Sequence, residues 1–339
     1  MVTFMIEFHY MLGPFFDGSV LDKEQRLHTK IKLKYMNYFI SKNRLPENQS
    51  AGNRTGTSET LRGKSFKQQQ IPRYIKESKL DYVAGVIDGD GNFDIRNTGS
   101  KKGDRILKSI RVRMSIRDVE VLYELKKILN CGILRTNTNL VDYHISTHVD
   151  MKALIEHLNG RIRLKVLGFK EACQLCGIEY KPADYVIEKN SNYLAGLIDT
   201  DGSVVFCYSR NVITLTLEFK CNDYSSKLNL NEAIEDCKPI VIKLNKKNQT
   251  KGRVFHSIRF VWQDVASMNS LYRFARNCRL HSRFKFYRCM QIKSFLKIRS
   301  FKTAEKHSYL HQVYSSWVIR FIRYLNPSYK NVKYYSELS

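Results

Sequence analysis

Two stretches of this 339-residue chain carry nearly the same ten letters. Tyr82–Gly91 reads YVAGVIDGDG, and Tyr193–Gly202 reads YLAGLIDTDG. Seven of the ten letters are identical, and the offset between the copies is 111 residues. A period of that length suits a whole domain, because solenoid repeats have periods of about 20 to 50 residues. The chain is therefore predicted to hold two related domains in tandem.

Each copy is followed by runs in which apolar and polar residues alternate. In the first unit these runs are Asn92–Asn97, Ser109–Arg117 and Asp142–Ser146, and the middle run has arginines on its polar face. Between them Leu122, Leu125, Ile128 and Leu129 have helical spacing after Asp118, a candidate N-cap, and a further helix is expected around Leu154–Leu158. Period two indicates half-buried strands.

The second unit repeats this order. Alternation returns at Ile213–Lys220 and at Ser257–Gln263. Each unit is therefore predicted to be α+β with antiparallel sheets.

Polar segments mark the boundaries between these units. Residues 181–192 are polar, contain Pro182 and form the expected linker. We predict a first domain over residues 72–180 and a second over residues 193–339. Residues 1–71 form an N-terminal extension, in which 31–40 suits a short helix and the Asn-, Ser- and Lys-rich stretch 41–70 is expected to be flexible.

The charge of the chain indicates a polyanionic partner. Lys and Arg number 57 against 32 Asp and Glu, which gives a formal net charge of +25. Residues 253–339 alone hold 17 basic and three acidic residues. Basic side chains placed against phosphates release condensed counterions, so nucleic acid is the expected ligand. The sequence contains no run of 18 or more apolar residues, so a membrane span is not predicted.

The repeated motif has physical consequences if it is helical. Asp81 is a reasonable N-cap for the first copy, and the small pairs Ala84–Gly85 and Ala195–Gly196 would let two such helices pack closely. Gly91 and Gly202 suit helix ends with a left-handed backbone. The acids of the motif then lie at helix C-termini, where the dipole disfavours them unless a cation lies between them. Carboxylate oxygens with open positions suit Mg²⁺ beside a phosphodiester.

These strings resemble the motif of the LAGLIDADG family, over roughly residues 75–325. The resemblance implies an αββαββα fold for each domain, pseudo-two-fold symmetry with the motif helices at the interface, and a saddle of antiparallel strands in the DNA major groove. It implies that Asp90 and Asp201 bind divalent metal, Mg²⁺ or Mn²⁺, and that Gly89 and Thr200 lend backbone carbonyls. Asp88 and Asp199 are interpreted as mainly structural, closing the helix ends.

The resemblance also implies a basic catalytic residue late in each domain. When Arg161–Lys165 is set beside His281–Lys285, Lys165 matches Lys285, and these lysines are the candidates to activate water or stabilise the phosphorane. Ordinary phosphate contact is the alternative role. Family members often have a Gln near the end of the second strand, where this chain has Ile116 and approximately Cys221. That departure puts the positioning of water in question.

Strand side chains on the charged faces are expected to contact DNA, by reading bases or by holding phosphate. The candidates are Arg96, Arg111, Arg113, Arg117, Lys220 and Arg259. The predicted function is homing endonuclease: a monomer that hydrolyses phosphodiesters in a long double-stranded DNA site and leaves a staggered cut.

Two other functions fit the same fold. One is an RNA maturase that assists splicing of a group I intron, either alone or together with cleavage. The other is a DNA-binding regulator without catalysis, which the two retained motif acids argue against. Localisation is expected to be mitochondrial by analogy with intron-encoded proteins, with the chloroplast as the alternative.

Overall fold

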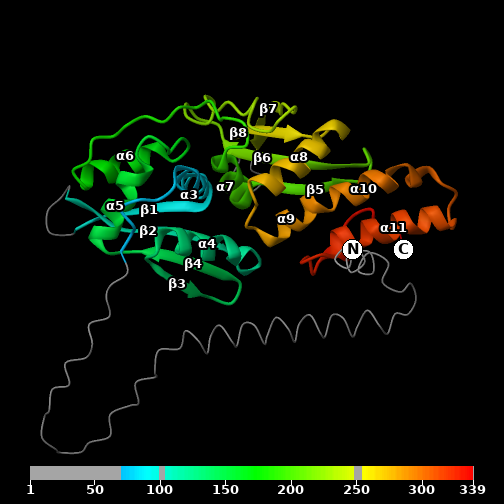
Figure 1. The fold of residues 1–339 in the computed structure, drawn as a ribbon, viewed down its shortest axis with the longest axis horizontal. Helices are drawn as coiled ribbons and strands as arrows, with labels where there is room; N and C mark the ends of the chain where they lie inside the picture. Colours follow the sequence, from blue (N-terminus) through cyan, green and yellow to red (C-terminus); the bar gives the residue numbers. More distant parts are fainter. Residues whose placement is uncertain (1–69, 99–103, 248–253, 339) are drawn as a thin grey trace, which may run out of the picture. The chain divides into compact units, whose positions relative to one another are not determined.

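The computed structural model describes residues 70–98, 104–247 and 254–338. The expectations for residues 31–40 and for most of 41–70 lie outside these ranges. The described residues belong to one compact unit that begins at Lys67. Within it, two halves follow each other along the sequence, each with an antiparallel four-stranded sheet (Figure 1).

The first half begins with the first motif helix, and its sheet has the strand order β1-β2-β4-β3. Its elements are α3 (Glu77–Asp90), β1 (Gly91–Asn97), β2 (Arg105–Ser115), η1 (Ile116–Asp118), α4 (Val119–Leu129), β3 (Ile133–Thr136), β4 (Leu140–Ile145), α5 (His148–Leu158) and α6 (Val166–Leu175). The predicted strand over residues 109–117 is confirmed up to Ser115, in β2, where Ile110, Val112 and Met114 are buried while Arg113 is exposed. Its last two residues, Ile116 and Arg117, belong to η1 instead, and Ile116 is exposed.

The second half begins with the second motif helix, and its sheet has the order β5-β6-β8-β7. Its elements are α7 (Asn192–Asp201), β5 (Ser203–Cys207), β6 (Val212–Lys220), β7 (Ile240–Lys247), β8 (Val254–Trp262), α8 (Val265–Asn277), α9 (Arg283–Met290), α10 (Ile292–Ile298), η2 (Arg299–Thr303), α11 (Tyr309–Arg323), η3 (Tyr329–Asn331) and η4 (Tyr335–Glu337). The mixed α+β class with two antiparallel sheets is confirmed.

One element of the expected pattern is replaced in the second half. Where the first half has α4 after its second strand, residues 222–238 form turns. The Asn222 side chain accepts hydrogen bonds from the backbone N–H groups of Tyr224 (3.0 Å) and Ser225 (2.8 Å), and Asn229 does the same for Asn231. Such local side-chain bonds compete with helix formation. The Asn- and Ser-rich sequence therefore turns where the first half is helical.

Three local expectations were wrong. The helix α3 begins at Glu77, so Asp81 does not cap it. The Asp118 side chain makes no capping bond to α4. Gly91 and Gly202 are extended, with φ of −71° and −68°, and not left-handed. Glycine is required at Gly91 for another reason, because an added Cβ would lie 2.7 Å from Cα of Ile87.

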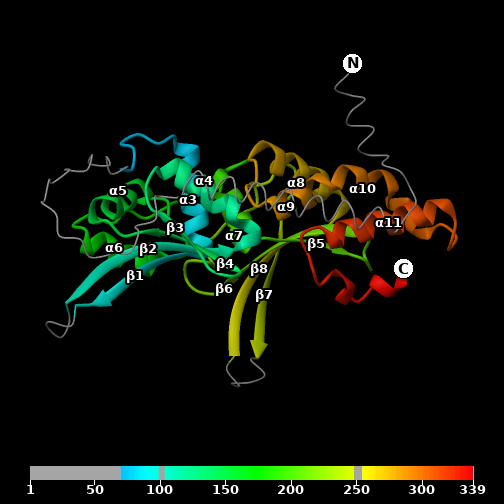
Figure 2. The same cartoon turned by 90° about the horizontal axis from the view of Figure 1, so that it is seen from below.

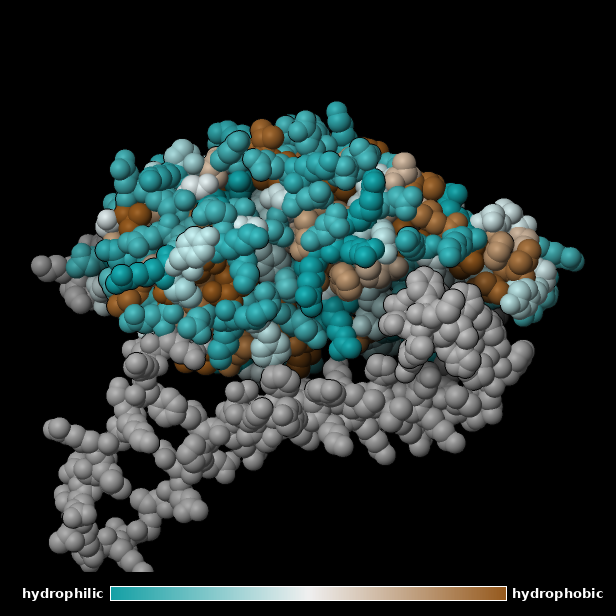
Figure 3. Space-filling view, viewed as in Figure 1, coloured by the Kyte–Doolittle hydropathy of each residue, from teal (hydrophilic) through white to brown (hydrophobic). Residues whose placement is uncertain are grey.

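The helices cover one side of the sheets and leave strand residues open on the other. Figure 2 shows most helices above the strands, with β7 and β8 extending away from them. The core is a single cluster that spans both halves. Its C-terminal part is aromatic, since Phe206 of β5 contacts Phe295, Trp317 and Phe321. Figure 3 shows a largely hydrophilic surface with small apolar groups.

Candidate active site at the paired motif helices

The two motif helices pack directly on each other. A Cβ on Gly85 would overlap the carbonyl oxygen of Tyr193, and one on Gly196 would lie 2.8 Å from the backbone nitrogen of Val86. Both clashes are with backbone atoms, which cannot rotate away. The prediction that small residues bring these helices together is confirmed, and the glycines make the contact.

The first acid of each motif is buried and fully used inside the protein. Asp88 accepts hydrogen bonds from the backbone N–H groups of Arg163 (2.7 Å), Leu164 (3.0 Å) and Lys165 (2.9 Å). Asp199 accepts them from His281 (2.7 Å) and Ser282 (3.0 Å). The two carboxylates thus hold the segments that lead into α6 and α9, and do not close their own helices.

Each of these acids is completed by a tyrosine from the other half. The Tyr193 hydroxyl donates to Asp88 (2.8 Å), and the Tyr82 hydroxyl donates to Asp199 (2.9 Å). Burial raises the pKa of Asp199 to about 6, although these hydrogen bonds and Lys285 oppose the shift. The reciprocal pair is what a pseudo-two-fold axis between the helices produces. Tyr82 and Tyr193 are the first residues of the two motif copies, and this identity was the sequence signal that could have predicted the pair.

The second acid of each motif is the last residue of its helix. Asp90 is half-buried, and the Asp201 side chain is exposed. The packed protein around Asp201 and then the negative charge of Asp90 raise its pKa to about 6, although Asp201 is partly open to solvent. Burial also raises the pKa of Asp90, and Lys165 and Lys285 oppose that shift. The structure thus brings Asp90, Asp201 and both predicted lysines within electrostatic range of one another.

The two lysines reach the ends of the motif helices. Lys285 is buried, and its Nζ donates to the carbonyl oxygens of Ile198 (2.9 Å), Asp199 (2.8 Å) and Thr200 (2.7 Å). Lys165 is half-buried and donates to the carbonyls of Gly89 (2.6 Å) and Gly91. Burial lowers the pKa of each lysine, and the surrounding carboxylates oppose this. The carbonyls of Gly89 and Thr200, candidate metal ligands, therefore accept from lysines here.

The end of β2 adds a residue that the sequence interpretation missed as part of the site. Ile116 is exposed, and Asp118, two residues later, is buried. The Asp118 carboxylate accepts a hydrogen bond from the Ser282 hydroxyl in the other half, just before α9. Asp118 also lies close enough to Asp90 and Lys285 to influence the pKa of both. The sequence does not reveal that Asp118 is buried, because an aspartate just before a helix is equally typical of an exposed N-cap.

Most of the predicted DNA-contacting residues form ion pairs with neighbouring carboxylates. Arg96 and Arg111 both contact Asp94 (2.7 and 3.1 Å). The remaining pairs are Arg113–Asp142 (2.5 Å), Arg259–Glu218 (2.7 Å) and Arg117–Asp118 (3.5 Å), and Arg117 also stacks on the Phe284 ring at 4.0 Å. Lys220 lies exposed at the end of β6.

The donor set at the helix ends suits a hard divalent cation. Within the described ranges no group of three or more His, Cys, Asp or Glu residues could hold a metal by itself. Two carboxylates with nearby backbone carbonyls fit an ion that also takes oxygen ligands from substrate and water.

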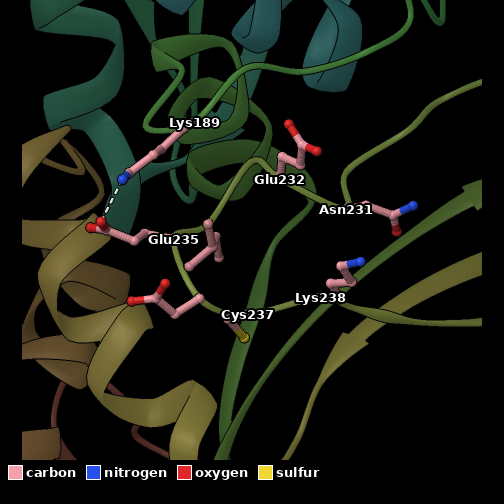
Figure 4. A pocket seen from close by; sticks show the side chains of 8 residues that line it. Lys189, Asn231, Glu232, Glu235, Cys237 and Lys238 are labelled. Atoms are coloured by element: carbon pink, nitrogen blue, oxygen red, sulfur yellow. Dashed lines mark hydrogen bonds and ion pairs between the residues drawn. The ribbon is translucent and has the colours of Figure 1, made fainter.

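A shallow pocket lies apart from these residues. Its lining comes from the linker and the turn segment: Lys189, Asn231, Glu232, Ile234, Glu235, Asp236, Cys237 and Lys238. Figure 4 shows Glu232 pointing away from Glu235, which pairs with Lys189. The two carboxylates therefore do not point toward a common ligand. None of the helices in the described part is long and apolar enough to span a membrane.

Comparisons with known proteins agree with this architecture. Residues 83–176 match the family model of the LAGLIDADG endonuclease. The intron-encoded DNA endonuclease ai2a of Dictyostelium discoideum is 25% identical over 281 residues, 80% of this chain and 85% of that protein. An uncharacterized cox1 intron-2 protein of 37.2 kDa from Schizosaccharomyces pombe is 23% identical over 59% of this chain and 61% of its own length.

Solved structures with similarity include the LAGLIDADG homing endonuclease I-GzeII in complex with its DNA target. It has 13% identity, covers 77% of this chain and 99% of that chain, and has a TM-score of 0.45. I-SmaMI bound to cleaved DNA has 13% identity, 75% and 97% coverage, and a TM-score of 0.42. The family-model match assigns residues 83–176 to a LAGLIDADG endonuclease domain, and residues 193–202 repeat the motif that opens it.

Proposed function

We propose that this chain is a homing endonuclease that recognises a long double-stranded DNA site and hydrolyses one phosphodiester in each strand, leaving a staggered cut. The observation that carries the proposal is the pair Asp90 and Asp201, held at the adjacent ends of two closely packed helices. Two acids in pseudo-symmetric positions suit two phosphodiesters on opposite strands. The names of the relatives, including DNA endonuclease ai2a, support the same substrate.

The carboxylates of Asp90 and Asp201 would hold Mg²⁺ or Mn²⁺. The carbonyls of Gly89 and Thr200, which accept from Lys165 and Lys285, would contribute through their second lone pair. A bound divalent ion would polarise the phosphodiester and lower the pKa of a water. The protein itself supplies the two acids and, within electrostatic range of both, two lysines.

The contacts of Lys285 favour one of its two candidate roles. An ammonium group has three N–H donors and no lone pair, and Lys285 uses three donors on three carbonyls. In that state it cannot accept a proton from water. We therefore assign Lys285 to neutralising negative charge near the phosphate, while Lys165, with contacts to two carbonyls, remains the candidate to move a proton.

The partner is double-stranded DNA, bound by a monomer because one chain supplies both halves. The net charge of +25 and the arginines on the open strand faces support this. We propose a mitochondrial location, which the cox1 intron name of the Schizosaccharomyces pombe relative supports. No comparison supports the chloroplast alternative.

The test is cleavage of DNA that carries the uninterrupted host-gene sequence, with and without Mg²⁺. Asp90→Asn and Asp201→Asn are each expected to lower the cleavage rate by about 100-fold or more while binding is retained. The matched control is Asp223→Asn, which removes an exposed acid at the position equivalent to Asp118. Full cleavage by both motif variants, or equal cleavage without divalent metal, would contradict the proposal.

An RNA maturase function remains the second candidate, alone or with cleavage. The observation behind it is the basic C-terminal part, in which α10, η2 and α11 follow the last strand of the second half. Splicing of the parent intron that depends on added protein would support it, and splicing that is unchanged by the protein would exclude it.

A further inference from the structure

The two sheets carry an ion pair at the same place, with the charges exchanged. In the first half Asn92 lies opposite Arg111, and in the second half Ser203 lies opposite Thr216. Because Asn92 and Ser203 each follow the motif glycine, Arg111 matches Thr216, and two residues further Arg113 matches Glu218.

The partners of these two residues also match. Arg113 of β2 lies directly opposite Asp142 of β4, and Glu218 of β6 lies directly opposite Arg259 of β8. The first half thus has its arginine on β2 and its acid on β4, whereas the second half has the acid on β6 and the arginine on β8.

Stability alone does not explain these pairs. The Arg113 side chain is 57% exposed, and an ion pair that water screens contributes little to stability. A carboxylate on a face that meets a polyanion also repels phosphate. Such an acid is useful there when it orients an arginine or accepts a hydrogen bond from a base.

The atoms used in the pairs fit that role. Arg113 donates to Asp142 through Nε (2.5 Å) and Nη2 (3.0 Å). Arg259 donates to Glu218 through the same atoms, at 3.0 and 2.7 Å, both to Oε2, while Oε1 accepts from the Ser257 hydroxyl (2.7 Å). Both pairs leave the Nη1–Nη2 edge of the guanidinium outside the pair, and that edge matches the O6 and N7 acceptors of guanine. A carboxylate oxygen has further lone pairs for the N4 amino group of the paired cytosine.

We propose that Arg113–Asp142 and Arg259–Glu218 are base-reading units, each recognising one G·C pair in the major groove. In each unit the arginine would donate to O6 and N7 of guanine, and the carboxylate would accept from the N4 amino group of the paired cytosine. Because the arginine sits on different strands in the two halves, the guanines lie at non-equivalent places, and the target is not palindromic there. This inference rests on the proposed function.

The first experiment compares cleavage of the host-gene sequence with cleavage of all its single-base variants. The wild type is expected to prefer G·C over other pairs by about 10-fold or more at one position in each half-site. Asp142→Asn should flatten the preference in the first half-site only, and Glu218→Gln in the second only. The control Glu235→Gln removes an acid of the pocket ion pair and should leave both preferences unchanged.

The second experiment exchanges one pair. Arg113→Asp combined with Asp142→Arg keeps the ion pair and moves the arginine by one strand, about 4.8 Å. The preferred guanine should then change its strand or move to a neighbouring position in the first half-site. Thermal melting confirms that the exchanged protein is folded. If the wild type cuts and the folded exchange variant keeps the original profile, this inference fails while the proposed function stands. If the wild type neither binds nor cuts any of these DNAs, both fail.

Discussion

The two halves share a backbone plan but are joined differently on the two sides of the motif helices. On one side buried side chains make the contact, since Ser282 donates to Asp118 and Phe284 lies under Arg117. At the matching positions on the other side, Ile162 replaces Ser282 and the exposed Asp223 replaces Asp118. A duplicated sequence motif therefore does not imply two equivalent centres.

The other side is joined through the linker, whose Tyr185 hydroxyl donates to the carbonyl of Arg163 in the first half (3.2 Å) and whose backbone pairs with the second half. The linker residue Ile187 donates to the carbonyl of Asn229 (3.0 Å), and Asn229 donates to that of Tyr185 (2.9 Å). These bonds use the turn segment that replaces a helix in the second half. The difference shows that the linker is a structural part of one interface, while polar side chains serve the other.

The largest effect is expected where the halves are alike. Gly85→Ala and Gly196→Ala each place a Cβ against backbone of the partner helix and should destabilise the protein by about 3 kcal/mol or more, measured by chemical denaturation. Gly168→Ala is the control, because its Cβ would lie 3.6 Å from Phe93 and alanine favours the helix. Tolerance of both motif substitutions would refute the close packing.

The lysines should differ between the halves. Lys285→Met removes the donor that three carbonyls share in a buried place and is expected to cost about 3 kcal/mol. Lys165→Met removes contacts with two carbonyls at a half-buried position and should cost about 1 kcal/mol. Denaturation of the two variants measures the difference, and equal losses would show that the two helix ends are held alike.

The contact between Asp118 and Ser282 should matter on one side only. Ser282→Ala removes this bond and the cap of α9 and is expected to cost about 1 to 2 kcal/mol. It should also slow cleavage of one DNA strand more than the other, seen as accumulation of nicked plasmid. The control Asp223→Asn alters an exposed side chain and should change neither quantity. Equal slowing of both strands would contradict the one-sided role.

The smallest effect concerns acid stability of the first half. The hydrogen bond from Arg113 lowers the pKa of Asp142 from its ordinary value. A carboxyl group with a lowered folded-state pKa stabilises the fold above pH of about 4, and this contribution is lost as the pH falls through the folded-state pKa. Asp142→Asn should therefore reduce the dependence of unfolding free energy on pH below 4, by less than about 1 kcal/mol. If the unfolding free energy depended on pH below 4 in the same way in the variant and the wild type, the Arg113–Asp142 pair would not be formed in solution.

Much of the fold followed from the sequence because its signals are local and periodic. Strand β2 and helix α4 were predicted from residues such as Ile110 and Leu122, whose spacing reports burial directly. The motif acids and lysines were found through the duplication and the family resemblance, and the structure brings them together. Their roles remain proposals.

The missed features depend on contacts across the interface. Nothing near Asp118 in the sequence indicates that its partner is Ser282, 164 residues away. The glycines after the motif were expected to be left-handed, but the requirement comes from the approach of Gly91 to Ile87. The turn segment 222–238 replaces a helix because several Asn and Ser side chains act together.

The crossed tyrosines have a consequence for how such a protein can be divided. A buried carboxylate in each half receives one of its donors from the opposite half. Separating the two halves would therefore remove a hydrogen-bond donor from a buried acid in each half and expose the packed faces of both motif helices to solvent. Fragments made by opening the chain between residues 181 and 191 should therefore be obligate partners that acquire their structure only by co-folding.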